Sequence, residues 1–257
     1  MVHGDRFAAV TELYQPTLHR LPDDTSGRFQ VLREFLLRWH GLVTGSVGRT
    51  VDRVGAAEAR VQKRLPLAVR EWIVLLDDID RIDGWGVVLR DCWGLKKVPN
   101  CPAFALLTAG EDDCHWGPFY RDLAQEDPPT QEFSPDYERS ASRFKHSRQV
   151  APRVSTWAIE FIVSYLRLSR SVEIEREMPL DAFSRLRERL PDGVVGSRVG
   201  ASELLEFPGG LIHADPDGPE QYTLRCYAPV GEGTRDEYQA AKRAFDERLG
   251  AMLGPES

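Results

Sequence analysis

The chain has 257 residues, of which 42% are hydrophobic and 28% are charged, and its formal net charge is -7. A chain of this size and composition can bury a substantial core, so we expect a globular protein. The acidic balance argues against nonspecific binding to nucleic acid or to an anionic membrane, and it favours basic partners.

The sequence also indicates a cytoplasmic setting. The N-terminus shows no basic region followed by an apolar run, so no secretory signal is visible. No apolar run approaches the roughly 18 residues that cross a membrane. The four cysteines, which we expect to be reduced thiols, contain no Cys-x-x-Cys pair: Cys92, Cys101, Cys114 and Cys226.

Helices are expected along most of the chain. A short helix is expected at about 4–20, and a new helix should begin at Pro66, with Val69, Trp72, Ile73 and Leu76 as its buried stripe. Apolar residues at three- and four-residue spacings predict the other helices, at about 27–42, 51–64, 155–168, 180–190 and 235–253. Ser155 is a candidate cap for the helix that follows it.

The stretch from Pro102 to Phe133 predicts a hairpin. An apolar run, Phe104 to Leu107, is followed by a turn at Gly110, and the chain returns as Cys114-His115-Trp116-Gly117. Between Glu111 and Asp127 six acids stand against one base, Arg121. These acids are the candidate partner-binding residues: Glu111, Asp112, Asp113, Asp122, Glu126 and Asp127.

Other interpretations of this acidic stretch remain open. It could be a solvated hairpin tip, and paired acids could in principle serve glycoside hydrolysis or bind a hard cation. Asp112-Asp113 lacks the alternating oxygen ligands of a calcium loop, however.

The remaining segments predict strands and connectors. Loops and one short strand are expected at 84–101, and an exposed basic connector at 139–153. Three short strands are expected at 204–207, 211–213 and 222–227, separated by turns rich in Pro and Gly. Because these strands are grouped apart from the helices, we expect an α+β fold with an antiparallel sheet.

No recognisable setting for chemistry emerges. A zinc site at Cys92, Cys101, Cys114 and His115 lacks paired ligands, and Cys114 and His115 should point to opposite faces of a strand. No Gly-x-Ser-x-Gly elbow is present, although Cys114 with His40, His146 or His213 stays an alternative. We therefore expect no catalytic residue, cofactor or metal.

Six tryptophans mainly indicate packing. Trp39, Trp72 and Trp157 lie on apolar helix faces and are expected in the core. Trp116 should share a strand face with Cys114.

Three segments in order resemble the SMI1/KNR4 (SUKH) superfamily: GRFQVLREFLLRWHG, AAEARVQKRLPLAVREWIVLL and FALLTAGEDDCHWGPFYRDLAQEDPPTQEF. The likeness rests on Leu65-Pro66 with Trp72, the Trp116-Gly117 pair and Asp127-Pro128-Pro129, and it covers about 28–135. One departure is Ile73, which stands where an aromatic residue commonly follows the tryptophan.

The resemblance implies a SUKH-like α+β domain, which we place at 27–257 after an N-terminal extension at 1–26. For bacterial members it implies an immunity protein that binds and neutralises a toxin, often a nuclease. An acidic protein facing a basic toxin domain would agree with this. The alternative is a regulatory or scaffold protein with the same fold and no toxin partner.

Overall fold

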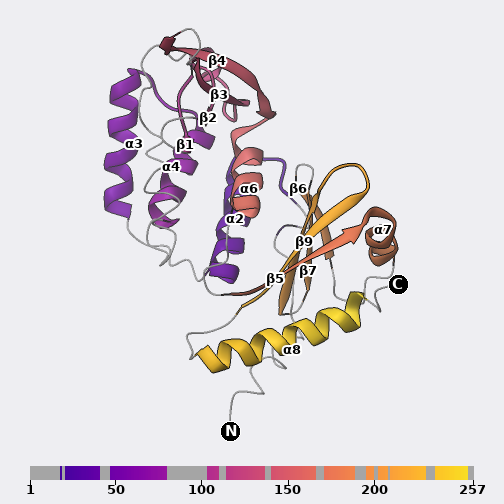
Figure 1. The fold of residues 1–257 in the computed structure, drawn as a ribbon. Helices are drawn as coiled ribbons and strands as arrows, with labels where there is room; N and C mark the ends of the chain where they lie inside the picture. The colour runs from indigo at the N-terminus through magenta and orange to yellow at the C-terminus, as the bar shows by residue number, and fades with distance from the viewer. Residues whose placement is uncertain are drawn as a thin grey trace. The chain divides into compact units, whose positions relative to one another are not determined.

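Figure 1 shows the computed structural model of the chain, which separates into two compact units. The N-terminal unit is Leu21–Ile162, and the C-terminal unit is Val163–Ser257 together with Met1–Arg20. The structure describes Leu18 and residues 21–40, 47–79, 103–109, 114–136, 140–165, 171–188, 195–199, 202–207, 209–229 and 235–253. The helix expected at 4–20, apart from Leu18, and the segment 84–101 therefore lie outside the described residues.

The N-terminal unit combines helices with a four-stranded antiparallel sheet in the order β1-β2-β3-β4. Its elements are α2 (Thr25–His40), α3 (Val47–Val61), α4 (Leu67–Ile79), β1 (Leu107–Ala109), β2 (Cys114–Gly117), the 3-10 turn η2 (Tyr120–Asp122), β3 (Thr130–Asp136), β4 (Ser140–Ala151) and α6 (Val154–Tyr165). Three expected helices are confirmed. The boundaries of α2 and α3 lie within four residues of the expected 27–42 and 51–64, and α4 begins one residue after Pro66.

Helix α3 ends where Gln62 adopts a φ of 54°, which reverses the chain direction. Glu58 organises the link to α4. Its carbonyl oxygen accepts the Lys63 N–H at 3.3 Å, and its Oε1 accepts the Leu65 N–H at 3.0 Å. The Leu65-Pro66 pair is thereby fixed just before α4.

The core of this unit is aromatic and is centred on α4. All four residues of the expected stripe are buried: Val69, Trp72, Ile73 and Leu76. The ring of Trp72 meets those of Trp157 and Phe161 from α6 edge-on, with centroids 4.9 and 6.1 Å away. The prediction that Trp39, Trp72 and Trp157 belong to the core is confirmed.

The expectation of a basic connector at 139–153 is wrong. Residues 140–151 form β4, which pairs antiparallel with β3. The register between the two strands shifts at three places along the pair. Basic residues do not prevent strand formation at the edge of a sheet, where they discourage pairing with other chains. Ser155 is also not the cap of α6, because the helix already begins at Val154.

The C-terminal unit contains a five-stranded antiparallel sheet in the order β5-β9-β8-β7-β6. Its elements are β5 (Ser171–Pro179), α7 (Leu180–Glu188), β6 (Val195–Val199), β7 (Ser202–Phe207), β8 (Gly210–Pro216), β9 (Gln221–Pro229) and α8 (Arg235–Leu253). The three expected strands correspond to β7, β8 and β9, and the two expected helices to α7 and α8. Strands β5 and β6 were not expected.

One face of this sheet packs on α7 and α8. The shared core includes Ile174, Ile212 and Cys226 from the strands, Phe183 from α7 and Phe245 from α8. The alternation of β5 explains its place in the sheet, since Val172 and Ile174 are buried and Glu175 and Glu177 are exposed.

The described residues thus form an α+β fold with two antiparallel sheets, one in each unit. The α+β class and the antiparallel pairing were expected. The division into an extension at 1–26 and one domain at 27–257 stays a prediction. In the part of the chain that the structure describes, no helix is long and apolar enough to cross a membrane.

Candidate functional site

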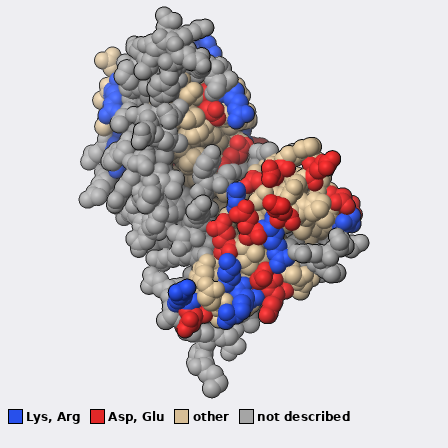
Figure 2. Space-filling model, viewed as in Figure 1, with Lys and Arg blue, Asp and Glu red and all other residues tan. Residues whose placement is uncertain are grey.

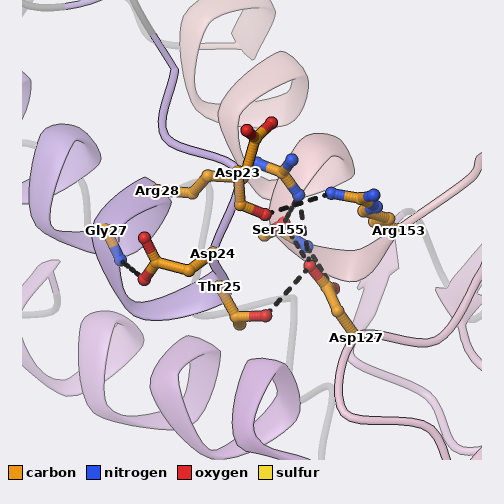
Figure 3. Close-up of polar contacts among 8 residues, drawn as sticks. All are labelled: Asp23, Asp24, Thr25, Gly27, Arg28, Asp127, Arg153 and Ser155. Atoms are coloured by element: carbon orange, nitrogen blue, oxygen red, sulfur yellow. Dashed lines mark hydrogen bonds and ion pairs between the residues drawn. The ribbon is translucent and has the colours of Figure 1, made fainter.

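The acidic stretch ends at Asp127, in a loop that contacts helices α2 and α6 of the N-terminal unit (Figure 3). The Asp127 carboxylate accepts the Ser155 N–H at 3.0 Å through Oδ1, and the Ser155 hydroxyl at 2.5 Å through Oδ2. Oδ2 also lies 3.5 Å from Thr25 Oγ1 and 3.6 Å from Arg28 NH1. Asp127 therefore ties the first turn of α6 to the first turn of α2, and we call this set the Asp127 junction.

The backbone of the same loop caps two helices. The Glu126 carbonyl accepts the Ala68 N–H at the start of α4 at 3.1 Å, and the Pro128 carbonyl accepts the Val154 N–H at 2.8 Å. The first N–H groups of a helix have no partner within the helix, so these contacts satisfy donors that would otherwise be left unpaired. A carboxylate at the start of α6 also complements the helix dipole.

Two further hydrogen bonds fix the start of α2, one within its first turn and one from the residue before α6. Asp24 accepts the Gly27 N–H at 2.7 Å through Oδ1, which is a typical capping contact. Arg153 reaches the Asp23 carbonyl at 3.4 Å. The junction therefore fixes where α2 begins relative to α6.

The charges of the junction are paired and mostly removed from water. The side chains of Asp127 and Arg28 are 10% and 11% exposed. A carboxylate that accepts several hydrogen bonds and faces a guanidinium is well compensated for its burial. Asp127 therefore has a structural role, and a partner protein could reach only a small part of it.

The other candidate acids occupy different environments. Glu126 is exposed, whereas the side chain of Asp122 in η2 is 21% exposed and lies 4.0 Å from Arg121 Nε. Glu111, Asp112 and Asp113 lie outside the described residues. The assignment of these acids to a partner surface stays a prediction. Of the three candidate acids that the structure describes, Glu126 is the most exposed.

The expected hairpin is present between β1 and β2. Leu107 pairs with Trp116, and Ala109 with Cys114. The first strand was expected at Phe104 to Leu107, but it spans Leu107–Ala109, so Phe104 to Leu106 precede it; they are fully buried, as expected for core support. A Cβ on Gly117 would lie 1.8 Å from the Phe104 carbonyl oxygen, so only glycine allows the two backbones to approach this closely.

The motifs of the resemblance meet at this hairpin. Trp72 Nε1 donates to the Leu106 carbonyl at 3.1 Å, and the Leu106 N–H donates to the Trp116 carbonyl at 2.7 Å. The backbone of Leu106 therefore links Trp72 of α4 to Trp116 through two hydrogen bonds. The loop of Asp127 caps the same helix α4.

A second polar cluster lies in the C-terminal unit. Asp215 accepts hydrogen bonds from Ser202 and from Arg225 NH1, the latter at 2.9 Å, and its Oδ1 lies 3.1 Å from His213 Nε2. Burial alone would raise the pKa of Asp215, but the nearby His213 imidazole, the hydrogen bond from Ser202 and the Arg225 guanidinium together hold it below its ordinary value.

Sequence reasoning missed this cluster, although the alternation of β8 offered a signal. His213 and Asp215 are two residues apart on one strand and so share a face. The Ser202 hydroxyl donates to the Asp215 carboxylate, whose Oδ1 also lies 3.1 Å from His213 Nε2, and not to the imidazole, so the serine–histidine contact of a catalytic triad is not formed. The arrangement binds three strands together and suits a structural role.

Two of the four cysteines, Cys114 and Cys226, and the candidate ligand His115 lie among the described residues. Burial raises the pKa of Cys226 to about 12, so its thiol stays protonated and unreactive. Cys114 and His115 do lie on opposite faces, as expected, since His115 is buried and Cys114 is half-buried. The described ranges contain no group of three metal-ligating side chains, and Cys92 and Cys101 lie outside them.

Charged side chains are prominent on the C-terminal unit. In Figure 2, acidic side chains are spread over the strands of its sheet and several basic side chains lie along α8. Ion pairs also form in this unit: Arg176 of β5 lies 2.6 Å from Asp246 of α8, Arg187 of α7 lies 3.0 Å from Glu203 of β7, and Arg225 of β9 lies 2.9 Å from Asp215 of β8. Much of the charge of this unit is thus paired.

Comparison with protein families, curated proteins and solved structures finds no match to this chain. The resemblance to SUKH proteins therefore rests on the quoted sequence segments alone and stays a prediction.

Proposed function

We propose that this chain is a non-enzymatic, SUKH-like protein-binding protein, and that it is an immunity protein that neutralises a cognate toxin. The supporting observation is that the quoted motifs, far apart in the sequence, contact one another in a single unit. Trp72 bonds to the strand region that pairs with Trp116-Gly117, and the Asp127 loop caps α4.

Charge supports a basic partner. The chain carries a net charge of -7, and three successive acids, Glu111, Asp112 and Asp113, stand in the sequence between β1 and β2. Complementary charge accelerates association and helps to select a partner. A toxin that binds nucleic acid, such as a nuclease, would present the basic surface that fits.

Co-expression tests this proposal. A toxin encoded beside this chain should arrest growth alone, and growth should recover when both are produced. Purified together, the two proteins should form a stable complex. If no neighbouring gene product is toxic or forms a complex, and pull-downs return host signalling proteins instead, the chain is a regulatory scaffold.

A further inference from the structure

One end of the C-terminal sheet carries an exposed group of apolar residues. Strand β5 finishes at Pro179 and passes directly into α7 at Leu180, and the end of β8 and the turn after it carry Pro216 and Pro219. The three prolines are exposed, and Leu180 is 43% exposed. Water alone would favour polar residues at a turn and at the start of a helix, so the group is typical of a contact surface.

These residues are contiguous. Strand register aligns Met178 of β5, Tyr222 of β9 and Pro216 of β8 in one row across the sheet. The Leu180 N–H donates to the Glu220 carbonyl at 2.9 Å, which holds the start of α7 against the turn. Met178 and Tyr222 pack against the core of the unit, so they join the exposed residues to it. We define the proline platform as Met178, Pro179, Leu180, Pro216, Pro219 and Tyr222.

The platform is preorganised. Each proline ring fixes one φ angle, and Gly218 supplies the φ of 79° in the turn. The Asp217 N–H donates to the Gln221 carbonyl at 2.8 Å, and the ring of Tyr222 lies 4.4 Å from that of Phe183 in α7. Binding to a surface that is already ordered costs less conformational entropy than binding to a loose one.

Acids surround the platform. The segments 177–181 and 216–221 contain no base, and their four acids are exposed: Glu177, Asp181, Asp217 and Glu220. Asp181 pairs with Arg185 at 2.7 Å, whereas the other three acids have no cationic partner in the described part of the chain. Figure 2 shows acidic side chains gathered at this end of the unit. A second copy of the chain would bring like charges together here, but a basic segment would be attracted.

We propose that the proline platform is a docking surface for a basic protein segment that places an apolar side chain beside Leu180. The platform buries this side chain, and lysine or arginine side chains of the segment reach the surrounding acids. Pro179 and Pro216 lack a backbone donor, so recognition proceeds through side chains and not by addition of a strand at these positions. The surface belongs to the C-terminal unit and the acidic hairpin to the N-terminal unit, so this proposal goes beyond the proposed function and needs no toxin.

Two synthetic peptides test the charge of the partner, one of alternating lysine and leucine and one of alternating glutamate and leucine. Measured by fluorescence anisotropy with the full-length chain, the lysine peptide should bind at least about tenfold more tightly. The combined substitutions Glu177→Lys, Asp217→Lys and Glu220→Lys should weaken its binding at least about tenfold. Equal affinity of the wild type for both peptides, or no effect of the triple variant, would overturn the proposal.

A second triple variant separates the platform from net charge. Reversal of Asp236, Glu188 and Glu247 to Lys changes the net charge equally at exposed positions of α7 and α8 outside the platform. It should weaken binding of the lysine peptide less than about threefold, because the peptide does not lie beside these residues. Equal weakening by the two triple variants would show that only net charge attracts the peptide, and would overturn the proposal.

An uncharged substitution tests the apolar contact. Leu180→Gln should weaken binding of the lysine peptide at least about fivefold, because the anchor loses the side chain against which it is buried. Leu37→Gln is the matched control, since Leu37 is 58% exposed on α2, and it should change the affinity less than about twofold. Equal affinities of the two variants would contradict the anchor. A dimer in sedimentation that Leu180→Gln dissociates would assign the platform to a second copy of the chain, and would also overturn the proposal.

Discussion

Asp127 and Asp215 have comparable surroundings in the two units. Each accepts a serine hydroxyl and lies beside an arginine, but Asp127 joins α2 to α6, whereas Asp215 joins the consecutive strands β7, β8 and β9. The role of Asp127 does not follow from local pattern, because its donors are as far as 102 positions away, whereas the partners of Asp215 lie only 10 and 13 positions away. Sequence reasoning identified Asp127 as one acid of a cluster and could not show which of them turns inward.

Replacement of Asp127 tests the structural role of the junction. Asp127→Ala should lower the free energy of unfolding by about 3 kcal/mol, because Arg28 and two donors of Ser155 lose their acceptor. Urea denaturation measures this. Glu126→Ala is the control and should change stability by no more than about 0.5 kcal/mol, since its side chain is exposed. Equal small losses in both variants would contradict the junction.

Acidification tests the second cluster. The folded pKa of Asp215 is below its ordinary value of 3.8. Its contribution to stability is therefore complete above the unfolded pKa and is lost as the pH falls through the folded pKa. Between about pH 5 and pH 2 the wild-type protein should lose more stability than Asp215→Asn, as followed by urea titrations at each pH. Parallel curves would argue against a lowered pKa.

Elements with strong apolar periodicity were predicted well. Helix α4 has its expected stripe, and α8 spans the expected residues 235–253. Strand β4 was missed because its many basic residues suggested a connector. Strand β5 was missed although Val172 and Ile174 alternate with acids, a period of two that is typical of a strand.

The hairpin depends on close backbone contact at Gly117. Gly117→Ala should destabilise the protein by about 3 kcal/mol or more, because the new methyl group overlaps the Phe104 carbonyl. Gly55→Ala is the control: a Cβ there meets nothing within 4 Å, and the helix α3 should gain about 0.5–1 kcal/mol. Thermal and urea unfolding measure both. A neutral Gly117→Ala would contradict the packing of β2.

At the scale of the whole molecule, sequence reasoning predicted the α+β class and expected one domain. The chain forms two compact units, and each has its own sheet. The grouping of Met1–Arg20 with the C-terminal unit depends on contacts between residues far apart in the sequence, which periodicity does not report.

Hydrogen exchange in Asp127→Ala shows whether the units unfold together. We expect faster exchange in α2, α4 and α6, and unchanged exchange in strands β5, β8 and β9, because each sheet has its own hydrogen-bonded ladder. A common increase in both units would show instead that the chain unfolds as the single domain expected at 27–257.

The central claim is that the chain recognises a basic protein through its acidic hairpin. The direct measurement is the affinity for the toxin encoded beside it, by calorimetric titration. Reversal of Glu111, Asp112 and Asp113 to Lys should weaken binding at least about tenfold without loss of stability. Reversal of three exposed acids of the C-terminal unit, Asp236, Glu188 and Glu247, changes the net charge equally and should weaken it less than about threefold. Equal effects of the two triple variants, or no effect of the first, would contradict the claim.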